Sequence, residues 1–196
     1  MVAERLPLHG FVLVGGQSSR MGQDKAMLVF RGQPMAEIAI DKLKEVCEVV
    51  SVVGNRDDLA AFAPVAHEQR TGCGPAAGVE AGVSTALQEW ALFIPVDAPF
   101  VPAELLHTWA QQALVMAQDG VSVLFAEAMQ PAFCMVRRNH APKLQSLLES
   151  GERRLMRVLD QLGEVYVYRV EDARAAEWFR NLNTPEELAA AEAASY

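Results

Sequence analysis

Residues 8–25 read LHGFVLVGGQSSRMGQDK, a short apolar run followed directly by a glycine-rich loop with two cations. The apolar part stops at Gly15-Gly16, which predicts a buried strand ended by a turn. In the loop, glycines let the backbone approach a phosphate closely, and Arg20 and Lys25 add positive charge. The stretch therefore predicts a phosphate site directly after the first strand. The alternative is a glycine-rich turn that carries two solvated cations.

The glycine-rich loop differs from two familiar phosphate motifs. It is neither a Walker A sequence, which ends Gly-Lys-Ser/Thr, nor a Gly-x-Gly-x-x-Gly fingerprint. A second stretch, residues 72–78, reads GCGPAAG; it is one residue too long for that fingerprint, and Pro75 removes an N–H group. Such a helix start lets a base or ribose lie against the backbone near Gly74, or it simply packs closely on the sheet, and both interpretations stay open.

Strands and helices alternate along the rest of the chain. The predicted strands after residues 8–14 are 49–53, 64–66, 90–96, 121–126, 132–136 and 165–170. The predicted helices are 34–46, 57–62, 76–88, 102–118, 140–149, 153–162 and 184–194, the last with a capping box at its start. Continuous apolar strands between helices predict a three-layer α/β fold with a mostly parallel sheet covered on both faces. No linker divides the chain, so we expect a single domain, residues 1–196.

Asp97 follows the predicted strand 90–96 at its carboxyl end. Ligands of parallel sheets bind outside the carboxyl ends of the strands. The loops that leave these ends are 15–25, 54–58, 67–78 and 97–102. A carboxylate at such a place, with water and phosphates as further ligands, suits Mg²⁺. The alternative is an aspartate that caps the turn before Pro99.

Composition excludes several classes of protein. The chain has 17 basic and 25 acidic residues, a net charge of −8, and 51% hydrophobic residues, so it is too apolar to be disordered and too acidic for binding nucleic acid by general phosphate neutralisation. No stretch approaches the roughly 20 apolar residues of a membrane span, and no signal segment is evident. We expect a cytoplasmic protein without a membrane or nucleic-acid partner. Three separated cysteines and four histidines lack metal-ligand spacing, which predicts packing thiols and ordinary histidines.

Four separate motifs occur in a fixed order along the chain. They are LVGGxSxRMGxDK at 13–25, GPxAG at 74–78, PVDxPF at 95–100 and NxNTPEEL at 181–188. Together they resemble the molybdenum cofactor guanylyltransferase family, over residues 10–190. The resemblance implies a Rossmann-like nucleotidyltransferase fold, GTP and molybdopterin as substrates, and Mg²⁺ as the metal. It also implies transfer of GMP to the terminal phosphate of molybdopterin with release of pyrophosphate, with molybdoenzymes or their chaperones as the proteins that receive the product.

The resemblance assigns a role to each matching position. Residues that would line the nucleotide loop, hold phosphates or contact the nucleotide are Leu13, Val14, Gly15, Gly16, Arg20, Lys25, Asn55 and Gly74. Asp97 matches the metal-binding aspartate, and Asn181 and Asn183 match the motif that faces the pterin. Arg20, Lys25 and Asp97 would carry the catalysis.

One position departs from the family pattern. The family usually has an aspartate in the loop before the Gly-Pro motif, whereas residues 67–73 here read HEQRTGC. Glu68 is the acidic residue that could replace it, and its extra methylene leaves the contact with base or ribose open. Val14 replaces the usual alanine and Ala76 the usual leucine, and both keep apolar character.

Two classes of alternative stay open. The first is a cytidylyltransferase that acts on the same pterin, or a sugar-phosphate nucleotidyltransferase; the Gly-x-Asp-Lys ending at 22–25 looks like the guanylyl branch. The second is an inactive nucleotide-binding protein that delivers cofactor to a molybdoenzyme. The presence of both Lys25 and Asp97 argues against it, because docking alone needs neither a metal nor a cation for the leaving group.

Overall fold

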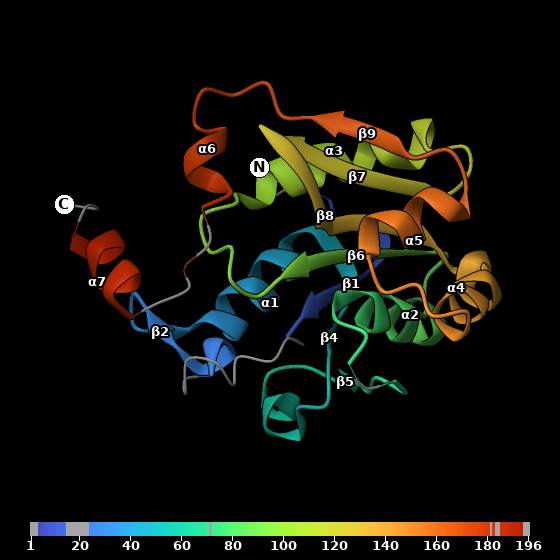
Figure 1. The fold of residues 1–196 in the computed structure, drawn as a ribbon. Coiled ribbons are helices and arrows are strands. Elements are labelled where there is room, and N and C mark those ends of the chain that lie inside the picture. The colour runs from blue at the N-terminus through green and yellow to red at the C-terminus, as the bar shows by residue number, and fades with distance from the viewer. Residues whose placement is uncertain (1–3, 15–23, 71, 181, 183–184, 194–196) are drawn as a thin grey trace.

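A seven-stranded sheet forms the centre of the computed structural model, and helices cover both of its faces (Figure 1). The structure describes residues 4–14, 24–70, 72–180, 182 and 185–193. In spatial order the strands are β5 (Val65–Ala66), β4 (Cys47–Val53), β1 (Leu6–Leu13), β6 (Trp90–Pro95), β8 (Ala128–Arg137), β7 (Val121–Ala126) and β9 (Tyr166–Arg169). Among the described strands of this seven-stranded sheet, β8 alone runs antiparallel to its neighbours, so the predicted mostly parallel sheet is confirmed.

Strand β1 lies where the strand order reverses. The chain moves from β1 to β4 and β5 on one side, then returns to place β6 on the other side. In open α/β sheets the ligand crevice forms at such a reversal, outside the carboxyl ends of the strands. The topology therefore predicts a ligand site at the loops that leave β1 and β6.

Alternating side chains of β1 contribute to two separate hydrophobic cores. Leu8 and Val12 pack into the core under helices α1 (Met35–Val46) and α3 (Ala103–Met116). Phe11 and Leu13 pack into the core under α2 (Pro75–Thr85), α4 (Ala141–Glu149) and α5 (Leu155–Leu162). This alternation is the period of two expected of a strand buried on both faces, and it explains the continuous apolar sequence.

Helix α2 packs unusually close to the sheet. A Cβ atom at Gly82 would lie 2.4 Å from the ring of Phe93 and 3.2 Å from that of Phe11. Only glycine fits such an approach, so α2 packs closely on the sheet at Gly82, whereas nothing lies within 4 Å of a Cβ position at Gly74. The two rings are themselves stacked, with centroids 5.2 Å apart.

Several elements differ from the sequence prediction. Strand β8 begins at Ala128 rather than 132, and helix α2 ends three residues early. The segment predicted as helix 57–62 is the 3₁₀ helix η3 (Asp57–Ala61). The prediction missed a hairpin of β2 (Val29–Phe30) with β3 (Gln33–Pro34), the short helix α6 (Ala175–Trp178) and the 3₁₀ helix η4 (Arg138–His140). The closing helix is α7 (Pro185–Ala193), and the predicted cap at Thr184 lies outside the described residues.

Two further observations concern the cysteines and the helices. Cys47, Cys73 and Cys134 are all buried. Among the described residues, no helix combines the length and the apolar character that a membrane crossing requires.

Candidate active site

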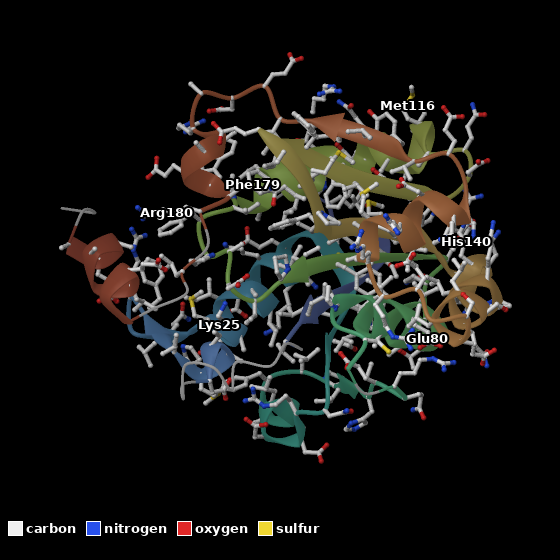
Figure 2. All side chains as sticks on the ribbon, viewed as in Figure 1. Lys25, Glu80, Met116, His140, Phe179 and Arg180 are labelled. Carbon is white, nitrogen blue, oxygen red and sulfur yellow. The ribbon has the colours of Figure 1, made fainter. Side chains whose placement is uncertain are left out.

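The carboxyl ends of β1 and β6 bring two predicted site residues together. Lys25 begins the 3₁₀ helix η2 (Lys25–Met27), which follows the loop after β1, and Asp97 lies two residues beyond the end of β6. Lys25 Nζ donates a hydrogen bond to Asp97 Oδ2 at 3.0 Å, although 72 positions separate the residues in sequence. The side chains are 28% and 20% exposed, so a ligand can reach both. Figure 2 shows Lys25 beside these strand ends.

Asp24 and Arg56 fix the turn that carries Lys25. Asp24 Oδ1 accepts a hydrogen bond from the N–H of Ala26 at 3.1 Å and so caps η2. Arg56, in the loop after β4, donates to both oxygens of Asp24 at 2.7 and 2.5 Å and also to Asp58 at 2.8 Å. These charged hydrogen bonds raise the pKa of Arg56 above its usual value and lower the pKa of Asp58. The loops after β1 and β4 are thereby joined through charge-assisted hydrogen bonds.

Backbone hydrogen bonds continue past the strand ends and align the rim of the sheet. The N–H of Val14 donates to the carbonyl of Val53 at 3.1 Å, and the N–H of Val96 donates to that of Leu13 at 3.2 Å. Leu13 is buried and Val14 half-buried, while Asn55 is exposed two residues beyond the end of β4. These three predicted nucleotide residues therefore lie at or just beyond the ends of two neighbouring strands, at the same edge of the sheet.

Glu68 lies beside helix α2 at this edge. A Cβ atom on Gly78 would meet the side chains of Leu13 at 2.8 Å and Val53 at 3.1 Å, and Glu68 Oε1 at 3.4 Å. Glu68 is half-buried, and burial raises the pKa of its carboxyl group. Gly74, at the start of α2, is exposed with φ of 58°, a conformation that favours glycine. The carboxylate thus faces an apolar wall, where it would accept hydrogen bonds from N–H or O–H donors.

The turn that carries Asp97 is held by backbone contacts on two sides. The N–H of Leu182 donates to the carbonyl of Asp97 at 3.2 Å. The ammonium of Lys42, in α1, donates to the carbonyl of Ala98 at 3.3 Å and to that of Pro99. Burial lowers the pKa of Lys42 to about 8. Leu182, the described residue in the middle of the NLN stretch, therefore lies against the Asp97 turn.

Five predicted site residues lie outside the described part of the chain. They are Gly15, Gly16, Arg20, Asn181 and Asn183. The last two flank Leu182, which is described.

The donor set at Asp97 fits one kind of metal. Among the described residues, no three His, Cys, Asp or Glu side chains gather as a metal cage. Mg²⁺ is usually held by one or two carboxylates, with water and substrate phosphates as its other ligands. A single carboxylate next to a lysine therefore fits Mg²⁺ that arrives with a polyphosphate.

A groove of about 810 Å³ lies elsewhere, between α3, β9 and the segment leading into α6. Neither Lys25 nor Asp97 lines it. Its charged side chains have both signs; they are Glu104, Arg169, Glu171, Asp172 and Arg174. This mixture does not favour a triphosphate, so the strand-end site remains the better phosphate site.

Sequence reasoning missed Arg56 and Lys42. Arg56 directly follows the predicted residue Asn55, but its partner Asp24 is 32 positions away, and nothing local indicates that pairing. The sequence does contain an indication that Lys42 is unusual. It occupies the helical stripe of buried Met35, Ala39 and Val46, where a charged residue calls for a specific partner.

The chain is similar to known proteins over most of its length. Residues 10–165 match the family described as MobA-like NTP transferase domain. The molybdenum cofactor guanylyltransferase of Vibrio cholerae is 34% identical over 187 residues, which cover 91% of this chain and 88% of that protein. That of Yersinia pestis is 34% identical over 187 residues, covering 91% of each chain.

Solved structures extend the likeness to the fold. The molybdopterin-guanine dinucleotide biosynthesis protein A of Archaeoglobus fulgidus aligns with a TM-score of 0.74 at 23% identity, covering 95% of this chain and 97% of that one. A CMP:2-keto-3-deoxy-manno-octonic acid synthetase complexed with CTP aligns with a TM-score of 0.69 at 12% identity, covering 97% and 98%. The predicted nucleotidyltransferase fold is thereby confirmed.

Proposed function

Since the chain belongs to the MobA-like NTP transferase family, we propose that it transfers GMP from GTP to the terminal phosphate of molybdopterin. The products are molybdopterin guanine dinucleotide and pyrophosphate. The observation that carries the proposal is the 3.0 Å pair of Lys25 and Asp97 at the strand-order reversal between β1 and β6. One charge of each sign at this edge is what a metal-bound triphosphate requires.

The reaction needs positioning and charge screening more than acid or base groups. An oxygen of the molybdopterin phosphate attacks the α-phosphorus of GTP, and the bond from that phosphorus to the bridging oxygen breaks as pyrophosphate leaves. The attacking phosphate is already ionised at neutral pH, because its second pKa is about 6. The site therefore has to hold two anions in line and stabilise the charge that builds up on the leaving group.

Lys25 and Asp97 have different roles in this reaction. In our proposal the ammonium of Lys25 binds phosphate oxygens of GTP and stabilises the departing pyrophosphate, together with Arg20. Asp97 holds Mg²⁺, which would neutralise phosphate charge and orient the phosphates when bound. Asp24 and Arg56 keep the Lys25 turn in place through the contacts described above.

The nucleoside lies along the β1 and β4 side of the same edge. Leu13, Val14, Gly15 and Gly16 line the loop that follows β1, Asn55 contacts the nucleotide from β4, and Gly74 allows close approach at the start of α2. We assign to Glu68 the role of the usual family aspartate. Its position beside Gly78 and the end of β1 supports contact with the guanine base or the ribose.

The acceptor lies on the opposite side of Asp97. Asn181 and Asn183 bind the pterin, and the hydrogen bond from Leu182 to Asp97 supports this side, because it brings their common neighbour to the metal-binding turn. Molybdoenzymes or their chaperones then receive the dinucleotide, and the reaction takes place in the cytoplasm.

Transfer assays test the proposal against its alternatives. Purified protein is incubated with Mg²⁺, molybdopterin and either GTP or CTP labelled at the α-phosphate, and in parallel with a sugar 1-phosphate as acceptor. We expect labelled dinucleotide from GTP only. Product from CTP alone would identify a cytidylyltransferase, and product with the sugar phosphate alone a sugar-phosphate enzyme. No product under any condition, with GTP still bound, would favour a delivery protein.

Asp97→Ala separates catalysis from folding in the same assay. The Lys25 and Asp97 side chains are partly exposed, and ion pairs of this kind contribute about 0–1 kcal/mol to stability. We therefore expect the substitution to abolish turnover while the thermal transition hardly moves. Unaltered turnover would contradict the metal role of Asp97.

A further inference from the structure

Lys42 is a cation on the inner side of α1 whose partners are backbone carbonyls. Its ammonium donates to Ala98 and Pro99, the two residues that follow Asp97. In the part of the chain that the structure describes, no carboxylate forms an ion pair with Lys42. By contrast, Lys44 of the same helix is half exposed and pairs with Asp41 at 2.9 Å.

The position of Lys42 carries a desolvation penalty for its ammonium group, which only specific hydrogen bonds can offset. Burial disfavours the ammonium form and lowers its pKa to about 8, although the charge of Glu45 acts in the opposite direction. Leucine or methionine on the same stripe of α1 would pack without that penalty. Hydrogen bonds from an ammonium to carbonyls are stronger than those between neutral groups, and here they are directed at a single turn.

The turn in question carries the carboxylate of the proposed metal site. Three successive carbonyls are held by groups from elsewhere: that of Asp97 by Leu182, and those of Ala98 and Pro99 by Lys42. With its carbonyls fixed, the turn has little freedom to rotate, so the Asp97 side chain keeps its direction toward Lys25. Groups behind a metal ligand commonly determine how well that ligand holds its ion.

We propose that Lys42 is a positioning residue, which holds the 97–99 turn so that the Asp97 carboxylate is directed to the metal and phosphates of the bound nucleotide. This inference rests on the proposed function. It adds one requirement to the proposed function, namely that the ammonium of Lys42 binds the carbonyls of the turn. Helix α1, which carries Lys42, contributes no other residue to the site.

The test compares Lys42→Met with Lys44→Met, a matched loss of one positive charge from the same helix. Mn²⁺ serves as the probe, and its binding to the protein with GTP is followed by electron paramagnetic resonance. GTP affinity is measured separately in the presence of EDTA. Turnover with Mg²⁺ is measured across metal concentrations to separate kcat from KM for the metal.

We expect Lys42→Met to weaken Mn²⁺ binding about 10- to 100-fold and to lower kcat, as removal of groups behind metal ligands usually does. GTP affinity without metal should change less than twofold, and Lys44→Met should behave as the wild type. Lys42→Arg, which keeps charge and donors, should recover part of the metal affinity. Equal Mn²⁺ affinities of Lys42→Met and Lys44→Met would overturn the inference.

Two further outcomes are decisive. If Lys42→Met does not fold, Lys42→Gln takes its place in the Mn²⁺ measurement; if neither folds, Lys42 serves stability alone and the inference fails. If the wild type binds Mn²⁺ with GTP but makes no dinucleotide, the proposed function fails. The Mn²⁺ comparison would still decide the role of Lys42.

Discussion

Acid should destabilise this protein through His9, a buried histidine of β1. Its ring stacks on Phe11 with centroids 4.0 Å apart. Nδ1 accepts the N–H of Leu87 at 3.1 Å, so the ring proton resides on Nε2, which donates to Ser51 Oγ at 2.9 Å. A second proton would have to occupy Nδ1 and would face the N–H of Leu87, in addition to the desolvation of the charge. Burial accordingly lowers the pKa of His9 to about 4.

The size of the effect follows from linkage. In the unfolded chain His9 has its ordinary pKa of 6.5, so between pH 6.5 and 4 the unfolded state binds more protons than the folded state. Stability due to neutral His9 is therefore complete above pH 6.5 and is lost as the pH falls toward 4. With these two values, the loss between pH 7 and pH 5 is about 2 kcal/mol.

Urea unfolding of the wild type and of His9→Gln at pH 7 and pH 5 measures this loss. Glutamine retains an amide donor and acceptor but does not titrate, and all other ionisable groups are shared, so their contributions cancel in the comparison. We expect the free energy of unfolding of the wild type to fall by about 2 kcal/mol more than that of the variant. Equal losses in the two proteins would refute the reasoning, as would an NMR titration of His9 near pH 6.5 in the folded state.

Four further substitutions concern the site and its support. Lys25→Met should weaken GTP binding and lower kcat together, measured by equilibrium binding and steady-state rates; an effect on stability alone would make Lys25 structural. Arg56→Ala should release Asp24, lower the free energy of unfolding in urea by about 1 kcal/mol and raise KM for GTP severalfold. An unchanged KM would show that the Arg56–Asp24 hydrogen bonds do not support phosphate binding. Gly82→Ala, with a ring 2.4 Å from the new Cβ, should cost about 1–3 kcal/mol without a specific effect on GTP. Gly78→Ala should additionally weaken GTP binding, and identical GTP affinities of the two variants would argue against a nucleoside beside Gly78.

The sequence predicts the elements of this fold better than their pairing. Strand β1 is evident from its apolar run because both of its faces are buried. The direction of β8 is not evident, because local periodicity carries no information about orientation. The turn from β7 to β8 is a single residue, Glu127, in a left-handed conformation with φ of 56°. Since neither glycine nor asparagine stands there, the sequence contains no turn signal at that point.

The same limit applies to the hairpin of β2 and β3. Its turn residues are Arg31 and Gly32, with φ of 51° and 81°. Asparagine or aspartate before glycine would have indicated a two-residue hairpin, but arginine does not. The hairpin matters for the site because the carbonyl of Leu28, directly before β2, accepts the N–H of Met35 at 2.9 Å. This bond ties the segment after Lys25 to the start of α1.

Site residues could be predicted where a single loop concentrates the chemistry. Lys25 and Asp97 each follow an apolar strand, and parallel strands end at one edge, so their proximity follows from the fold class. Arg56 and Lys42 could not be assigned in this way. Their partners, Asp24 and the carbonyl of Ala98, are brought to them only by the packing of α1 and β4 against β1.

Under the proposed function, the charge distribution favours a metal that is carried by the substrate. Residues 71–136 contain six acidic residues and no lysine or arginine, so this third of the chain repels a free triphosphate. Asp97 belongs to this acidic third and Lys25 to the preceding one, and the 3.0 Å hydrogen bond joins the two segments. Because both side chains are partly exposed, breaking the pair costs little, about 0–1 kcal/mol. In the proposed function, substrate would exchange this pair for two stronger contacts, phosphate to Lys25 and metal to Asp97, and a nucleotide without metal would gain only the first.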